Sequence, residues 1–138
     1  MGKINMPRVV IGGLIAGVVL NVIDFVMFGM ALQSQMAAAM QALGKPPMTN
    51  AQVPWFVFLD FVAGIALVWL YAAIRPRFGP GPKTAILGGV LIYIAITLVL
   101  FGFTNMGLMT MGMFVTGSIG AIVSTLAASL VGASIYKE

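Results

Sequence analysis

The fold is decided by one apolar stretch near the start of the chain, VVIGGLIAGVVLNVIDFVMFGM, residues 9–30. A helix needs about 20 apolar residues to cross the ~30 Å hydrocarbon core of a bilayer, and this stretch meets that length. Lys3 and Arg8 precede it, as basic residues precede the apolar part of a signal peptide, but that part is only ~7–15 residues long. We therefore interpret the stretch as an uncleaved first membrane span.

The whole chain has the composition of a membrane protein. Hydrophobic residues make up 61% of its 138 residues and charged residues 7%, with a mean hydropathy of +1.10, whereas soluble domains carry about 25% charged residues. Cysteine and histidine are absent, which excludes disulfides, thiolate nucleophiles and the usual zinc and haem ligands. We expect a protein that is not an enzyme, holds no cofactor and has the lipid bilayer as its main partner.

Three more apolar runs follow the first. The predicted spans are approximately residues 9–31, 52–74, 84–104 and 112–135. Residues 75–83, with three prolines and two glycines, separate the second and third spans and are expected to be non-helical. The sequence therefore predicts an all-α fold, an integral membrane four-helix transmembrane bundle that forms one domain over residues 1–138.

The segment between the first two spans has a different pattern. Leu32, Met36, Met40 and Leu43 form an apolar stripe opposite three glutamines. Gly44 follows as a candidate C-terminal cap. The pattern predicts a short amphipathic helix that lies in the membrane interface.

The basic residues predict the orientation. All seven lie outside the apolar runs, so the net charge of +4 does not indicate nucleic-acid binding. The N-terminus and the loop after the second span carry five of them, Lys3, Arg8, Arg75, Arg77 and Lys83. The loop after the first span has only Lys45. Because basic residues favour the cytoplasmic side, we expect both termini to be cytoplasmic, in a bacterial inner membrane.

Two acidic residues, Asp24 and Asp60, lie inside predicted spans, and Glu138 is the third acid of the chain. A carboxylate within a membrane span is costly and usually functional. Gly13 and Gly17 share a helical face with Asp24, and small residues of this kind direct a face towards a neighbouring helix. We therefore expect Asp24 to point into the bundle.

Helix geometry places both acids at the same depth, about 8 Å inside the outer edge of the hydrocarbon core. The predicted polar layer consists of Asn21, Asp24, Asp60, Thr116 and Ser118. Two unpaired carboxylates in such a layer must share a proton, stay neutral, bind a cation or face water. This indicates proton- or cation-linked transport or conduction. The alternative is that both acids are protonated and structural.

The fourth predicted span has a wide face of small residues that includes Gly117, Gly120, Ser124 and Ala128. Such a face allows close helix packing in a membrane. It can form the seam of a homo-oligomer, or it can pack within one bundle. The seam also supports a second class of function, a non-catalytic accessory subunit of a membrane complex.

Four methionines, Met106, Met109, Met111 and Met113, cluster before and at the start of the fourth span. Thioethers are soft ligands that select Cu(I), so copper handling is a minority hypothesis. Methionine also fills irregular apolar contacts at helix ends, and this is the more economical interpretation.

The layout resembles that of uncharacterised bacterial four-span membrane proteins in domain-of-unknown-function families. The likeness consists of a first span, a short helix that ends in Leu43-Gly44-Lys45, and three further spans, and it implies no activity. An acid in the first of four spans also resembles the small multidrug resistance transporters, whose essential carboxylate is a glutamate with aromatic partners in other spans. This chain departs from that pattern in having Asp24, the second acid Asp60 and a longer outer loop, so the likeness is an analogy for mechanism alone.

Overall fold

The computed structural model describes residues 3–137, and the chain is all-α over that range. In chain order the elements are α1 (Met6–Val26), the π-helical turn η1 (Met27–Ala31), α2 (Gln33–Ala42), α3 (Val53–Phe78), α4 (Pro82–Asn105) and α5 (Met111–Ile135). Four segments are long and apolar enough to cross a membrane, Met6–Ala31, Val53–Phe78, Pro82–Asn105 and Met111–Ile135. The predicted four-span architecture, with a short helix after the first span, is therefore confirmed.

Prolines explain where three of these helices begin. Pro7, Pro54 and Pro82 stand in the first turns of α1, α3 and α4, where the backbone N–H has no partner inside the helix and its loss costs nothing. Pro76 differs, because it lies inside α3. The prediction that residues 75–83 are non-helical was therefore wrong at both ends, since α3 continues to Phe78 and α4 already begins at Pro82. The helix passes Pro76 because a proline near a helix end removes only one of the last hydrogen bonds.

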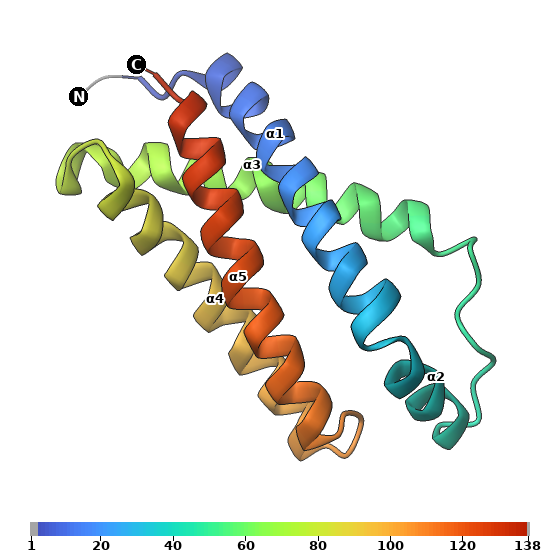
Figure 1. Ribbon diagram of the computed structural model, residues 1–138. Coiled ribbons are helices and arrows are strands. Elements are labelled where there is room, and N and C mark those ends of the chain that lie inside the picture. The colour runs from blue at the N-terminus through green and yellow to red at the C-terminus, as the bar shows by residue number, and fades with distance from the viewer. Residues whose placement is uncertain (1–2, 138) are drawn as a thin grey trace.

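The spans do not lie parallel to one another. Figure 1 shows α1, α4 and α5 side by side, with α5 between the other two, and α3 inclined across them. Both termini and the α3–α4 connection lie at one end of the bundle, which we call the terminal end. The opposite end, with α2 and the α4–α5 turn, is the distal end. With 26 residues, α3 is about 39 Å long, so a tilted α3 still has the length to cross a ~30 Å core.

Glycines fix the crossing of α1 and α3. A methyl group added at Gly13 would lie 2.5 Å from the Cα of Ile65, and one added at Gly17 would lie 2.9 Å from the Cα of Phe61. One added at Gly64 would collide with the backbone of Gly13 and Gly17. Side chains are therefore excluded from this contact, and the two backbones touch. Such contacts between small residues are typical of strongly inclined helix pairs in membranes.

The well-buried core occupies the terminal half of the bundle. Ala16 and Ala128 are fully buried there, and Val68 and Leu67 are 1% exposed. Towards the distal end the helices diverge, and every residue of the first part of α3, residues 53–59, is exposed. Side chains in that part of a spanning helix face lipid or another protein.

A cluster of aromatic and polar side chains joins the chain ends. The Tyr136 ring lies 6.0 Å from that of Tyr71 in an edge-to-face contact, and the Arg75 guanidinium lies 5.6 Å from the Tyr136 ring centre. The backbone N–H of Asn5 donates to the Tyr136 hydroxyl at 3.2 Å. These contacts hold both termini at the same end of the molecule.

The short helix α2 follows a bend at Leu32. The Leu32 side chain is 1% exposed, and Met36 and Met40 are half-buried, so the predicted apolar stripe faces the protein. Gly44 adopts a φ of +66°, and the N–H of Lys45 donates to the carbonyl of Met40 at 2.9 Å. This is a Schellman cap, the ending that the glycine predicted.

Candidate functional site: a carboxylate pair between α1, α3 and α5

The two intramembrane acids lie on facing helices. Gly17 contacts Phe61, so Asp60 lies level with the Gly17 turn of α1, and Asp24 follows about two turns, or about 9 Å, further along α1. Both side chains are half-buried. Their carboxylates lie close enough to interact electrostatically. The equal depth that the sequence predicted for the two acids stays a prediction.

Asn21 links α1 to α3 beside this pair. Its side-chain N–H group donates to the carbonyl of Gly17 at 2.9 Å and to the carbonyl of Val57 at 3.4 Å. Gly17 is one turn before Asn21, and Val57 is one turn before Asp60. The amide therefore ties the two helices together between the two acids, because α1 and α3 are antiparallel and Asp24 and Asp60 lie one turn away on opposite sides of this contact.

The contribution of α5 to the site is Ser124. Its hydroxyl faces Asp24 closely enough to interact with the carboxylate, and it also lies 3.3 Å from the carbonyl of Ala121. From the sequence, Ser124 was expected only in the packing face. Its contact with an acid could have been suspected because Ser124 is a polar residue within a face of small residues, at a position where a neighbouring helix must come close.

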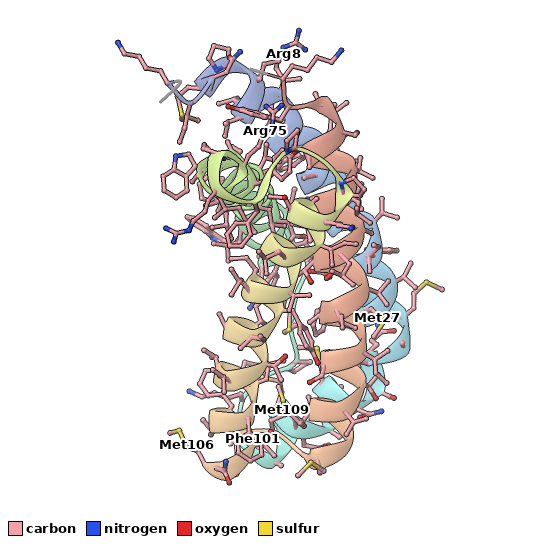
Figure 2. All side chains as sticks on the ribbon, turned by 90° about the vertical axis from the view of Figure 1, so that its left-hand side faces the viewer. Arg8, Met27, Arg75, Phe101, Met106 and Met109 are labelled. Carbon is pink, nitrogen blue, oxygen red and sulfur yellow. The ribbon has the colours of Figure 1, made fainter. Side chains whose placement is uncertain are left out.

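Thr116 and Ser118 do not belong to this group. The Met27 side chain packs against Gly120, so earlier residues of α5 lie further towards the distal end than Asp24 does. That part of α5 contacts α4 instead, with Gly117 beside Leu100. Figure 2 places Met27 part-way along the bundle and Met106 and Met109 at its distal end.

The position of Asp24 along the bundle follows from its neighbour on α5. The first span ends at Ala31, as the sequence predicted. Ser124, which faces Asp24, is 13 residues after Met111 and 11 before Ile135, or about 20 Å and 16 Å along α5. Asp24 therefore lies beside the middle of α5.

No basic residue lies within the apolar interior of any span, so the pair has no cationic side chain at its own level. Arg8 and Arg75 are at the terminal end, as Figure 2 shows. Over the described residues, no group of three or more His, Cys, Asp or Glu side chains comes together. What the site offers is two carboxylates with one hydroxyl beside Asp24. These are hard oxygen ligands, suited to a proton or an alkali or alkaline-earth cation.

The four clustered methionines lie in different surroundings. Met113 is 8% exposed, whereas Met106 is 70% and Met111 57% exposed. In Figure 2 the side chain of Met106 points away from the bundle and Met109 lies closer to its axis. Met113 thus fills an apolar contact at the start of α5, as the alternative interpretation of these residues expects.

The small face of α5 is covered within the chain. Gly117, Gly120, Ser124 and Ala128 are all buried, and α1 and α4 pack on the two sides of this helix. Gly120 contacts Met27 of η1, and Gly132, on the same face, contacts Ala16 of α1. This is the packing within one bundle that the sequence analysis set beside an oligomer seam.

Compared with known proteins, the chain matches no protein-family profile, no curated protein and no solved structure. The resemblance to other four-span proteins therefore rests on the spans themselves, and no family is identified.

Proposed function

We propose that this protein moves protons or small cations across a membrane through the carboxylate pair Asp24–Asp60. The observation that supports the proposal is the placement of the acids: they lie on two contacting helices, close enough to interact electrostatically, with no basic residue in the apolar interior of the spans. A structural polar contact would need only one acid, whereas this protein has two that interact.

The energetics of the pair favour an exchangeable ligand. An ionised carboxylate in an apolar medium is strongly destabilised, and two that interact repel each other. A shared proton or a bound cation removes this repulsion. Occupancy then depends on the proton or cation concentration on the side from which the site is reached, and this dependence is what a transport site requires.

The surrounding side chains support the same proposal. The Ser124 hydroxyl is placed to supplement the ligation of Asp24, and Asn21 holds α1 against α3 so that the two carboxylates stay together. In the orientation that we propose, the terminal end with its basic residues faces the cytoplasm of a bacterial cell, and the distal end faces outwards.

The test is proton flux in reconstituted vesicles. Purified protein in liposomes that contain a pH-sensitive dye should acidify the interior when a potassium diffusion potential is imposed. Asp24→Asn and Asp60→Asn should each abolish most of the flux, because either substitution leaves a single carboxylate with no partner. Glu138→Gln is the matched control, since it removes the only acid outside the spans and should retain the flux.

Each variant must keep the helix content and the monodisperse elution of the wild type. If both asparagine variants fold and conduct as well as the wild type, the pair does not carry protons. Repeating the assay with sodium or potassium gradients in place of the pH gradient identifies a cation as the transported species.

A second candidate function is that of an accessory subunit in a membrane complex. The observation in its favour is the unpartnered first part of α3, where Trp55 is 69% and Phe58 56% exposed. The small face of α5 is already covered, so partner binding is expected at α3 rather than at the fourth span. An accessory subunit should keep its assembly when Asp24 or Asp60 is replaced by asparagine, and should lose it when Trp55 and Phe58 are both replaced by alanine.

A further inference from the structure

Serine and threonine hydroxyls in membrane helices usually bond to a carbonyl of the preceding turn. Several of those in α4 and α5 do so, and others bond to a carbonyl elsewhere. Thr104 donates to the Leu100 carbonyl at 2.9 Å, and Thr125 donates to the Ala121 carbonyl at 2.8 Å. Ser129 reaches across to α4 and donates to the Ala85 carbonyl at 2.6 Å.

Two hydroxyls depart from this pattern. The buried oxygens of Thr97 on α4 and Ser118 on α5 have no hydrogen-bond partner within residues 3–137. Ser118 as a whole is only 9% exposed. A buried hydroxyl with no partner is expensive in an apolar medium, so each such group needs an explanation.

The two hydroxyls lie opposite each other. The α4–α5 pair is antiparallel, and its register is defined on one side by the Ser129–Ala85 hydrogen bond. On the other side it is defined by the contact of the Phe101 and Phe114 rings, whose centres are 5.6 Å apart. Between these two points, counting one residue forward on α4 for each residue backward on α5 brings Thr97 level with Ser118.

The geometry points to a water-binding site between Thr97 and Ser118 in the distal half of the α4–α5 contact. A hydroxyl both donates and accepts, so one water molecule can bond to both side chains, and backbone carbonyls of the adjacent turns can supply its further partners. A cation is disfavoured there, because no carboxylate lies nearby. The nearest acid is Asp24 of α1, which faces Ser124, six residues after Ser118 on α5. This site is separate from the carboxylate pair, and the inference does not rest on the proposed transport function.

The first test detects the water directly. Protein with labelled threonine methyl groups is placed in deuterated detergent, and magnetisation transfer from water to each methyl group is measured by NMR. We expect clear transfer to Thr97 and none to Thr125, which is 2% exposed and whose hydroxyl is already bonded. Absence of transfer to Thr97 would overturn the inference.

The second test asks whether the two hydroxyls share their ligand. Thr97→Val and Ser118→Ala should each lower the melting temperature. The decrease in the double variant should be smaller than the sum of the two single decreases, because the second substitution removes a hydroxyl that the first left unsatisfied. The matched control combines Ser118→Ala with Thr104→Val, whose hydroxyl is satisfied within its own helix. That pair should be additive. Additive decreases in melting temperature for Thr97→Val and Ser118→Ala would show that each hydroxyl bonds independently, and would overturn the proposal of a shared water molecule.

Discussion

At the scale of single residues, Asp24 and Asp60 have the most specific chemistry in this chain, because they interact electrostatically from different helices in apolar surroundings. Infrared difference spectroscopy can report whether they share a proton, since a protonated carboxyl group and a carboxylate absorb at different frequencies. We expect one coupled titration for the wild type, which disappears in Asp24→Asn and equally in Asp60→Asn. Two independent carboxyl bands, each unchanged when the other acid is replaced, would make both acids structural.

At the scale of helices, the glycine crossing of α1 and α3 is what positions the pair, so it should be sensitive to a single methyl group. Gly64→Ala places a Cβ against the backbone of Gly13 and Gly17, which cannot yield as a flexible side chain can. We expect a loss of about 2 kcal/mol or more in the free energy of unfolding, measured by detergent-induced unfolding in mixed micelles.

Gly102→Ala is the matched control for that substitution. Gly102 also lies inside a spanning helix, but apart from its chain neighbours and the adjacent backbone of its own helix, nothing lies within 4 Å of its added methyl group. This variant should be at least as stable as the wild type, because alanine favours the helix over glycine by up to about 1 kcal/mol. Equal stabilities for Gly64→Ala and Gly102→Ala would contradict the close backbone contact.

At the scale of the whole molecule, the distribution of charge predicts which end faces the cytoplasm. Lys3, Arg8, Arg75, Arg77, Lys83 and Lys137 lie towards the terminal end, and Lys45 belongs to the connection that follows α2 at the distal end. The chain has no cysteine, so single cysteines can be introduced without background. In intact cells, a membrane-impermeant maleimide should label Lys45→Cys and leave Lys137→Cys unlabelled until the membrane is opened.

A cysteine at Leu98, in the lipid-facing part of α4, should stay unlabelled under both conditions and serves as the control. Labelling of Lys137→Cys but not of Lys45→Cys in intact cells would reverse the orientation. Both acids lie inside candidate spans in either orientation, so the flux assay does not depend on this result.

The all-α class, the four spans, the short helix and its glycine cap could be predicted from the sequence because each is a local property. A run of apolar residues must satisfy its own backbone within one helix, wherever it lies in the molecule. Helix rise also converts sequence distance into depth, which predicts similar depths for Asp24 and Asp60. The end of α3 could not be predicted from the sequence, because Pro76 lies close enough to the helix end to be tolerated.

Only the tertiary structure decided which helix covers which face. The inclination of α3 depends on Gly13, Gly17 and Gly64 meeting across two helices, and a pattern within one helix does not identify its partner. Other contacts, of Gly132 with Ala16 and of Gly120 with Met27, set the register of α5, which brings Ser124 to Asp24 and leaves Ser118 opposite α4. Sequence by itself determined which segments enter the membrane, because hydropathy acts segment by segment. The tertiary structure decided the site, because close packing between segments depends on the shapes of residues that are far apart in the sequence.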